Sequence, residues 1–378
     1  MKTRHIQISF ILIFCTILLV PLFSTNLKDG AISSAEKRTL APKPSIKNED
    51  GTINQAYTSD FELWINDNIG LRSPIIETNA KLQYYIFKVL SNNSNMYLGP
   101  NGEFNYANEA MLADYQHTNL YTEDYLQAYA SSFQALKNNL TKQGIDVYYV
   151  QCWDKHSIYP EYFPTSVIQK GNISKTDQMV DALNKLTDIT IISPKQILID
   201  AKQDYPTYSV YGDSTHWTQR GAYIAYKQIM STINEHSNIQ YDILNDNDYN
   251  ITITDQGDTL FGGIHEEDYL EDFTIKSPQA ILANDRLTVG ADDERHSYRV
   301  NPTVSNDTRL LIIGDSYFNE FLVDDFAESF SETIMIWGDH LGQTIELIDA
   351  YKPDIVIFEA AERVDRSQAI IDTVDKLK

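Results

Sequence analysis

The stretch Leu310-Leu311-Ile312-Ile313-Gly314-Asp315-Ser316-Tyr317-Phe318 decides how the chain folds. Four consecutive aliphatic residues followed by glycine predict a short strand that is buried on both faces, and the residues from Ser316 to Leu322 predict the start of a helix. Ser316 then lies at a strand-to-helix turn, which exposes its hydroxyl beside backbone N–H groups and suits a nucleophile. Taken alone, Gly-Asp-Ser is more often a turn with a helix cap.

Short apolar runs alternate with amphipathic segments on both sides of this stretch. This alternation predicts a mainly parallel, three-layer α/β sheet with right-handed crossovers, whose sites form at the carboxyl ends of strands. The predicted strands are 145–150, 189–192, 208–211, 310–313, 333–336 and 354–358. The predicted helices are 122–140, 177–186, 194–201, 218–233, 342–350 and 365–377.

The N-terminus predicts a membrane segment. Lys2 and Arg4 precede an apolar run, 6–23, whose helix would span roughly 27 Å, close to the thickness of the hydrocarbon core. Both a signal peptide and an uncleaved anchor fit, and the length of the run favours the anchor. The basic residues then place the rest of the chain outside the cytoplasm.

The chain divides by composition into an anchor or signal peptide at 1–25, a polar stalk at 26–55 and a folded domain at 56–378. Within the last part, helical spacing predicts helices at 57–69 and 75–90, and a Pro-Asn-Gly turn predicts a hairpin at 96–104. Residues 242–305 lack a long helix and predict an irregular, β-rich insertion.

Charge and cysteine content exclude several function classes. A net charge of −23 argues against nucleic acid as a partner. Cys15 and Cys152 lie far apart, so neither a disulfide between them nor a cysteine metal site is expected. The run His265-Glu266-Glu267-Asp268 could bind a metal, but it fits a solvated acidic loop better.

A serine nucleophile needs a base, and His216 has the best setting for that role among the eight histidines. In Asp213-Ser214-Thr215-His216-Trp217-Thr218 an aspartate precedes the histidine by three residues, where it can orient the imidazole. Trp217 would form an apolar wall or pack at the start of the next helix. The alternative is that Asp213 caps a turn and His216 is an ordinary loop residue.

The two motifs together resemble the DHHW and alginate O-acetyltransferase-like group of SGNH hydrolases. Gly314-Asp315-Ser316-Tyr317 is similar to the GDS block, and 213–218 is similar to the Asp/His/Trp block, which precedes the serine in that group as it does here. The resemblance covers nearly the whole chain, with 242–305 the least matched. Many members carry the aspartate two residues before the histidine, whereas Asp213 lies three before it.

The resemblance implies an SGNH (flavodoxin-like) fold and an O-acetyltransferase or acetylesterase acting on a secreted or cell-surface polysaccharide. It implies Ser316, His216 and Asp213 as the catalytic residues and no cofactor or metal. Asn319, Lys155, Trp217 and Arg363 are candidates for oxyanion or substrate-lining roles. It also implies a membrane-bound O-acyltransferase as a possible donor of acetyl groups.

Two other functions fit the sequence. A non-catalytic member of the same fold could bind polysaccharide or scaffold an export complex. A metal-dependent phosphoesterase could use Asp213, His216 and Asp315. The protein would be a single-pass membrane protein with its catalytic domain outside the cytoplasm, or secreted if the N-terminal segment is cleaved.

Overall fold

The computed structural model describes residues 2–33, 38–90 and 95–375, which form two compact units. One unit comprises the chain up to residue 94 together with 258–266, and the other comprises 95–257 and the chain from 267 onward. The first unit contains one helix, α1 (Lys2–Phe23), that is long and apolar enough to cross a membrane. This helix fits the predicted signal anchor or signal peptide.

The rest of the first unit is built from short elements. These are β1 (Ile32–Ser33), β2 (Arg38–Thr39), α2 (Tyr57–Asn68), α3 (Arg72–Leu82), a π-helical turn (Gln83–Phe87), β8 (Thr259–Leu260) and β9 (Ile264–His265). The 26–55 segment contacts α2, because Asp67 accepts hydrogen bonds from the Arg38 guanidinium and the Ala41 N–H. The helix expected at 75–90 begins earlier and changes to π-helical geometry after Leu82.

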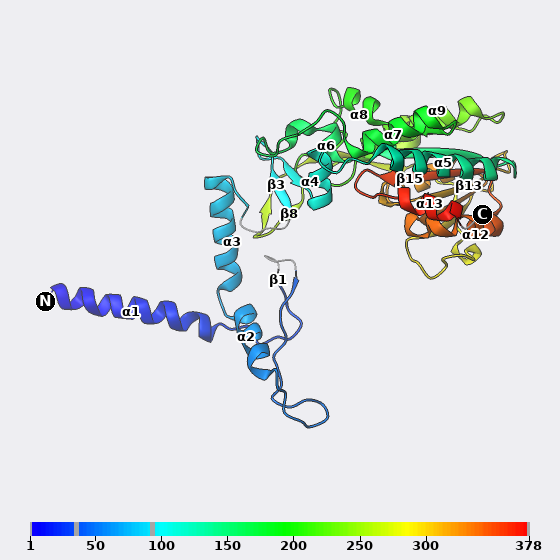
Figure 1. Ribbon diagram of the computed structural model, residues 1–378. Helices are drawn as coiled ribbons and strands as arrows, with labels where there is room; N and C mark the ends of the chain where they lie inside the picture. Colours follow the sequence, from blue (N-terminus) through cyan, green and yellow to red (C-terminus); the bar gives the residue numbers. More distant parts are fainter. Residues whose placement is uncertain (1, 34–37, 91–94, 376–378) are drawn as a thin grey trace. The chain divides into compact units, whose positions relative to one another are not determined.

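A seven-stranded sheet organises the second unit. Its strands in spatial order are β11 (Ile281–Leu282), β12 (Ser297–Val300), β14 (Glu332–Trp337), β13 (Arg309–Gly314), β15 (Ile355–Ala361), β5 (Asp146–Cys152) and β6 (Thr190–Ile192). The five from β14 to β6 are parallel, and β11 and β12 are antiparallel additions at one edge. The predicted mainly parallel α/β sheet is therefore confirmed (Figure 1).

Strand β13 separates two apolar cores, as the four consecutive aliphatics predict. Leu310 and Ile312 belong to one core, and Leu311 and Ile313 belong to the other. The first core is covered by α8 (Lys195–Ala201), α9 (Gln219–His236), α10 (Ser316–Asn319) and α11 (Val323–Ala327). The second is covered by α5 (Glu123–Thr141), α7 (Lys175–Leu186), α12 (Thr344–Tyr351) and α13 (Ser367–Asp375). The sheet thus lies between two helical layers.

The order of the strands determines where a site can form. From β13 the chain passes to β14 on one side and then to β15 on the other side. The carboxyl end of β13 is therefore a topological switch point, where the flanking connections diverge and leave a crevice. Ser316 lies two residues beyond that end.

The strand predicted at 208–211 is wrong, since Tyr208 makes only an isolated bridge to Trp217. The helix expected at 342–350 is present as α12, and a 3₁₀ turn (Gly338–Gln343) precedes it. Residues 242–305 are β-rich, as expected; β12 joins the main sheet, and β7 (Tyr249–Asp255) and β10 (Tyr269–Ile275) form an antiparallel pair. The last predicted helix extended to Leu377, which lies outside the described residues.

The remaining elements lie before β6. They are β3 (Met96–Leu98) and β4 (Phe104–Tyr106), which form the predicted hairpin, α4 (Glu109–Tyr115) and α6 (Lys155–Ile158). Thr122 caps α5 and Thr218 caps α9, each by accepting a backbone N–H.

Candidate active site

Ser316, His216 and Asp213 lie in one chain of hydrogen bonds. The Oγ of Ser316 is 2.6 Å from Nε2 of His216, and Nδ1 of His216 is 2.7 Å from Oδ2 of Asp213. The histidine side chain is largely buried, and the aspartate side chain is 47% exposed. The structure thus brings together the three residues that the sequence singles out for catalysis.

A tight turn explains how an aspartate three residues before the histidine reaches its ring. Oδ1 of Asp213 accepts the N–H and the hydroxyl of Thr215, both at 2.7 Å, and this folds the loop back on itself. Oδ2 is left facing His216. Burial alone would raise the pKa of Asp213, but the hydrogen bonds from His216 and Thr215 outweigh it and lower the pKa.

Arg363, on the turn after β15, fixes the tautomer of His216. Its Nη2 lies 3.0 Å from Nε2 of the histidine. A guanidinium can only donate, so Nε2 must be the nitrogen without a proton, and Nδ1–H must point to Asp213. The lone pair of Nε2 thus accepts from both the Arg363 guanidinium and the Ser316 hydroxyl, and the shorter contact, to Ser316 Oγ, is the one through which a proton can pass.

Arg363 is itself held by buried groups. Its Nη1 donates to Asp154 Oδ1 at 2.5 Å and to the carbonyl of Thr215 at 2.7 Å. Burial would lower the pKa of Arg363, but the charge of Asp154 outweighs it and raises the pKa. Tyr317 lies beneath His216 and also donates to the Thr215 carbonyl, at 2.8 Å. These contacts fasten the loop that carries His216 to the strands below it.

Two of the other predicted site residues are part of the core. Trp217 is 1% exposed and packs edge-to-face on Tyr317, so it is not a wall of the site. Lys155, a candidate for an oxyanion or substrate-lining role, is buried and donates to the carbonyls of Phe104 (2.6 Å) and Val210 (3.3 Å). Burial lowers the pKa of Lys155 to about 8. Asn319 is half-buried at the end of α10, one turn beyond Ser316.

Asp268 supports the site in a way that the sequence did not indicate. Its Oδ2 accepts the Ser209 hydroxyl and the N–H groups of Val210 (2.7 Å) and Tyr211 (2.9 Å). These two N–H groups therefore bond to a carboxylate instead of a neighbouring strand, which explains why 208–211 is not a strand. The prediction of a solvated acidic loop is wrong for Asp268, which is 9% exposed.

Asp315 and Glu359 fix the turn that carries the serine. Asp315 N–H donates to Oε2 of Glu359 at 2.6 Å, and Ala361 N–H donates to Oδ2 of Asp315 at 2.8 Å. The Asp315 carboxylate therefore accepts a hydrogen bond from the backbone of β15. This placement argues against a metal centre formed by Asp213, His216 and Asp315.

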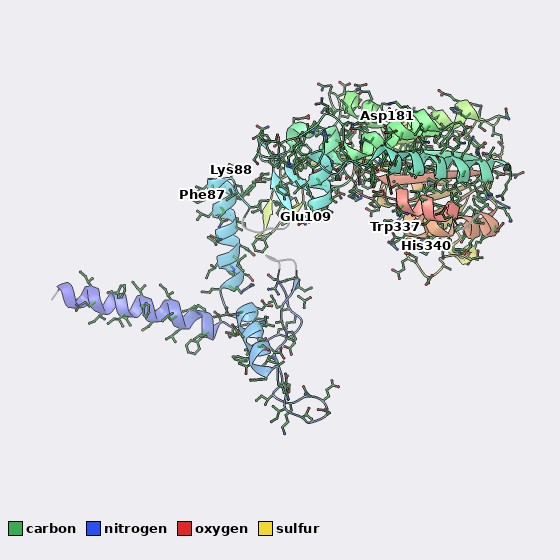
Figure 2. All side chains as sticks on the ribbon, viewed as in Figure 1. Phe87, Lys88, Glu109, Asp181, Trp337 and His340 are labelled. Carbon is green, nitrogen blue, oxygen red and sulfur yellow. The ribbon has the colours of Figure 1, made fainter. Side chains whose placement is uncertain are left out.

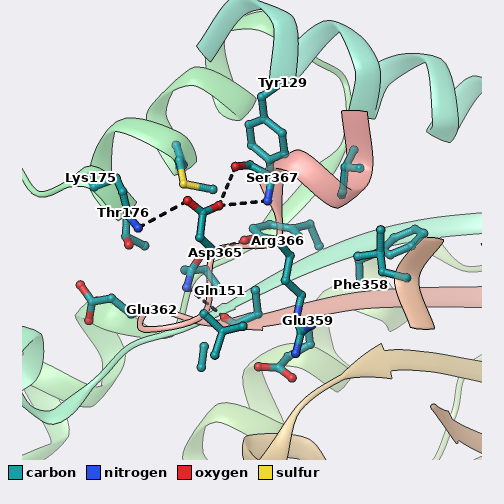
Figure 3. Close-up of a pocket in the computed structure, with 17 residues that line it drawn as sticks. Tyr129, Gln151, Lys175, Thr176, Phe358, Glu359, Glu362, Asp365, Arg366 and Ser367 are labelled. Atoms are coloured by element: carbon teal, nitrogen blue, oxygen red, sulfur yellow. Dashed lines mark hydrogen bonds and ion pairs between the residues drawn. The ribbon is translucent and has the colours of Figure 1, made fainter. Parts of the chain in front are cut away.

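Glu359 borders a small cavity under α13, shown in Figure 3, where Arg366 extends toward it. In the same view Asp365 bonds to Lys175 and Ser367. The cavity, about 10 Å³, holds little more than one water molecule and is too small for a substrate. Burial, together with the charge of Asp315, raises the pKa of Glu359 well above its usual range.

Glu359→Gln is expected to flatten the pH dependence of stability. In the unfolded chain Glu359 ionises above its ordinary value of 4.5, whereas the folded protein keeps the proton. The free energy of unfolding of the wild type therefore falls as pH rises above about 4.5, by up to about 1.4 kcal/mol per pH unit, and glutamine removes this contribution. Urea unfolding from pH 5 to pH 8 measures it, with the exposed Glu346→Gln as control. Parallel curves for wild type and Glu359→Gln would contradict the assignment.

Part of the chain matches a known family of proteins. Residues 111–260 match the family model described as "SGNH hydrolase-like domain, acetyltransferase AlgX". The matched segment includes Asp213 and His216 and ends before Ser316. No curated protein sequence matches the chain.

Solved structures similar to this chain include three bacterial proteins. Bacillus cereus PatB1 is 17% identical, with a TM-score of 0.49, over 66% of this chain and 92% of PatB1. A DHHW family protein from Eubacterium siraeum is 17% identical, with a TM-score of 0.48, over 66% and 89%. The O-acetyltransferase domain of Pseudomonas putida AlgJ is 16% identical, with a TM-score of 0.47, over 75% and 99%.

The similarity to a known family rests on the sequence match and not on these superpositions. The matched segment contains one of the two motifs that carry the resemblance, Asp213 to Thr218, but not the motif around Ser316. Residues 111–260 are thus similar to the SGNH hydrolase-like domain of the acetyltransferase AlgX.

Proposed function

We propose that this protein is a serine-dependent O-acetyltransferase or acetylesterase that acts outside the cytoplasm on a secreted or cell-surface polysaccharide. The observation that carries the proposal is the hydrogen-bond chain from Ser316 through His216 to Asp213. A non-catalytic protein has no need to hold a serine hydroxyl 2.6 Å from the unprotonated nitrogen of a histidine. This contact favours an enzyme over a binding or scaffold protein of the same fold.

The reaction proceeds in two halves. Ser316 Oγ attacks the carbonyl carbon of an acetyl ester while its proton passes to Nε2 of His216. The tetrahedral intermediate collapses, the leaving oxygen takes that proton, and Ser316 becomes acetylated. A sugar hydroxyl then attacks the acetyl carbon, its proton passes to Nε2, and Ser316 recovers it as the new ester leaves. Water in place of the sugar gives the esterase reaction.

The negative charge that develops on the oxygen of the tetrahedral intermediate needs hydrogen-bond donors beside Ser316. The backbone N–H of Ser316 is the first donor that we assign, and the amide of Asn319, one turn later, is the second. Asp213 stabilises the imidazolium, while Arg363 keeps Nε2 directed at the serine before the proton moves.

A groove beside the histidine suits the acceptor. Phe321 packs on the His216 ring and also lines a groove of about 280 Å³ with Tyr223, Tyr249 and Phe273. Aromatic faces stack on sugar rings, and the carboxylates of Glu320, Asp324, Asp325 and Glu328 in the same groove can accept hydrogen bonds from hydroxyls. These four carboxylates, on a chain of net charge −23, favour a neutral or amine-bearing polymer over a polyanion.

The N-terminal helix supports a site of action outside the cytoplasm. As an uncleaved anchor, α1 would hold the enzyme at the outer face of the membrane, where a membrane-bound O-acyltransferase could deliver acetyl groups. Cleavage of the same segment would release a secreted enzyme that uses a soluble donor.

The acetylated serine is the intermediate that tests the proposal. The full-length chain in detergent is incubated briefly with p-nitrophenyl acetate, quenched in acid and analysed by intact mass and peptide mapping. We expect one added acetyl group on the peptide containing Ser316, and none in Ser316→Ala. Acetylation at other residues only would show that the nucleophile is wrong. Release of acetate to water, compared with transfer to neutral and anionic oligosaccharides, then separates esterase from transferase.

A further inference from the structure

Two histidines and an aspartate converge at the turn that follows β14, away from the serine. Oδ2 of Asp293 lies 3.6 Å from Nε2 of His296 and 3.7 Å from Nε2 of His340. The two imidazole rings meet edge-to-face with centroids 4.6 Å apart. Figure 2 labels His340 next to Trp337, the last residue of β14.

Both rings are held so that Nε2 is the nitrogen without a proton. Nδ1 of His296 lies 2.8 Å from the carbonyl of Gly290, and Nδ1 of His340 lies 2.8 Å from Oε1 of Gln343. Each oxygen accepts only, so each Nδ1 carries the proton when the ring is neutral. This is the arrangement that outer-shell acceptors impose on metal-binding histidines.

The nitrogen of His296 lacks a hydrogen-bond partner among the residues that the structure describes. Its side chain is 0% exposed, and Nε2 is buried. A buried acceptor without a partner is costly and is rare in folded proteins.

The loop closes tightly on this ring. Gly290 has a φ of +69°, and a Cβ at that position would lie 2.5 Å from the His296 ring. Glycine is therefore needed both for the backbone conformation and for the space that the imidazole occupies.

We infer that Asp293, His296 and His340 form a binding site for a divalent transition metal ion, Zn²⁺ in the first place. Two nitrogens and a carboxylate oxygen are ligands that zinc prefers, and two ligands of a tetrahedral zinc lie about 3.4 Å apart. The nitrogen-to-oxygen distances of 3.6 and 3.7 Å are within a few tenths of that value. The side chains of His340 and Asp293 are 26% and 17% exposed, which leaves a route for the ion and room for a water as fourth ligand.

Arg295 competes for the same carboxylate. Its Nη2 lies 2.6 Å from Oδ2 of Asp293, and its guanidinium also packs on the Trp337 ring. Its side chain is 45% exposed and can move away. The positive charge of Arg295 repels a bound cation, so the affinity for the metal ion is lower than the three ligands alone would give.

A second cluster, Asp114, His156 and Glu362, also contains a buried imidazole Nε2 without a hydrogen-bond partner among the described residues, but its charges differ. Glu362 already accepts the Asp154 N–H (2.9 Å) and the Ser157 hydroxyl (2.7 Å). Burial would lower the pKa of His156, but the carboxylates of Glu362 and Asp114 outweigh it and raise the pKa to about 9. A protonated imidazole between two carboxylates is an ion-paired core, not a metal ligand.

The metal ion would link two loops at the carboxyl end of the parallel strands. Asp293 and His296 belong to the loop that leads into β12, and His340 belongs to the turn after β14. Trp337 pairs in register with Gly314, so this turn leaves the sheet at the same edge as Ser316. The ion would stabilise the loop before β12 and the turn after β14, and it would take no part in acyl transfer.

Zinc binding by the full-length chain tests the site directly. The protein, in detergent and free of any histidine tag, is stripped with a chelator and titrated with Zn²⁺ in competition with a chromophoric indicator. We expect one equivalent to bind, His340→Ala to weaken binding at least about 100-fold, and Gln343→Leu to weaken it about 10- to 100-fold through the lost outer-shell bond. Arg295→Gln should bind more tightly than wild type.

The matched variants make each outcome decisive. Thermal unfolding of the metal-free proteins checks that His340→Ala folds, and Zn²⁺ should raise the midpoint of the wild type but not that of His340→Ala. Equal affinity of wild type and His340→Ala overturns the proposal, because the ion is then bound elsewhere, for example at His156. Absence of binding by the wild type overturns it as well.

Discussion

Ser316→Ala is expected to reduce acetyl ester hydrolysis by at least about 1,000-fold. The hydroxyl is the atom that His216 deprotonates, and alanine leaves nothing within reach of Nε2 that could form an acyl-enzyme. The residual rate should equal that of the double variant Ser316→Ala/His216→Ala, because the histidine has no proton to accept once the serine is gone. Steady-state hydrolysis of p-nitrophenyl acetate measures all three.

The control for this result is Ser131→Ala, at an exposed position of α5, which should retain wild-type activity. Circular dichroism of Ser316→Ala should match the wild type, since the half-buried serine makes no core contact. A rate within tenfold of the wild type would mean that another residue carries the acetyl group.

Asp213→Asn should lower the turnover number by about 100- to 10,000-fold while leaving the fold intact. Asparagine can still accept the Thr215 N–H through its carbonyl oxygen, so the turn survives. Its NH₂ group then faces Nδ1 of His216, which must become the acceptor and move the ring proton to Nε2. The Nε2–H would then face the Ser316 hydroxyl and the Arg363 guanidinium, which are both hydrogen-bond donors. Nε2 could no longer accept the serine proton.

The measurement is the turnover number and KM for p-nitrophenyl acetate, with Asp204→Asn as a control at an exposed position. A structural role alone would reduce the folded fraction and leave the rate per folded molecule unchanged. If Asp213→Asn turns over at the wild-type rate, the carboxylate does not orient His216, and Arg363 alone sets the tautomer.

The sequence predicted the five parallel strands and the three residues that meet at the site because their signals are local. Four aliphatics before Gly314 predict a doubly buried strand, and Asp213 with His216 lies within one short turn. Strand β12, between β11 and β14, was missed because Ser297–Val300 is short and lies among polar residues, without an alternation that distinguishes it from a loop.

The supporting residues could not be predicted because their partners are distant. Asp268 holds N–H groups about 58 residues earlier in the chain, and the Arg363 guanidinium reaches His216 from 147 residues away. Similarly, 44 residues separate His296 from His340, a spacing that matches no metal-binding motif. Only tertiary structure shows that these side chains meet.

The position of β15 determines when the enzyme can become active. β5 pairs with β15, and the partners lie about 209 residues apart in the chain, while His216 and Ser316 are 100 residues apart. Loop closure over such lengths makes folding slow, and helices such as α5 and α9 should form long before the sheet is complete. During synthesis, β5 has only β6 beside it until β15 emerges, and its other edge remains open to wrong partners. Activity should therefore return later than helical content on refolding, because the last strand completes the crevice in which the serine meets its base.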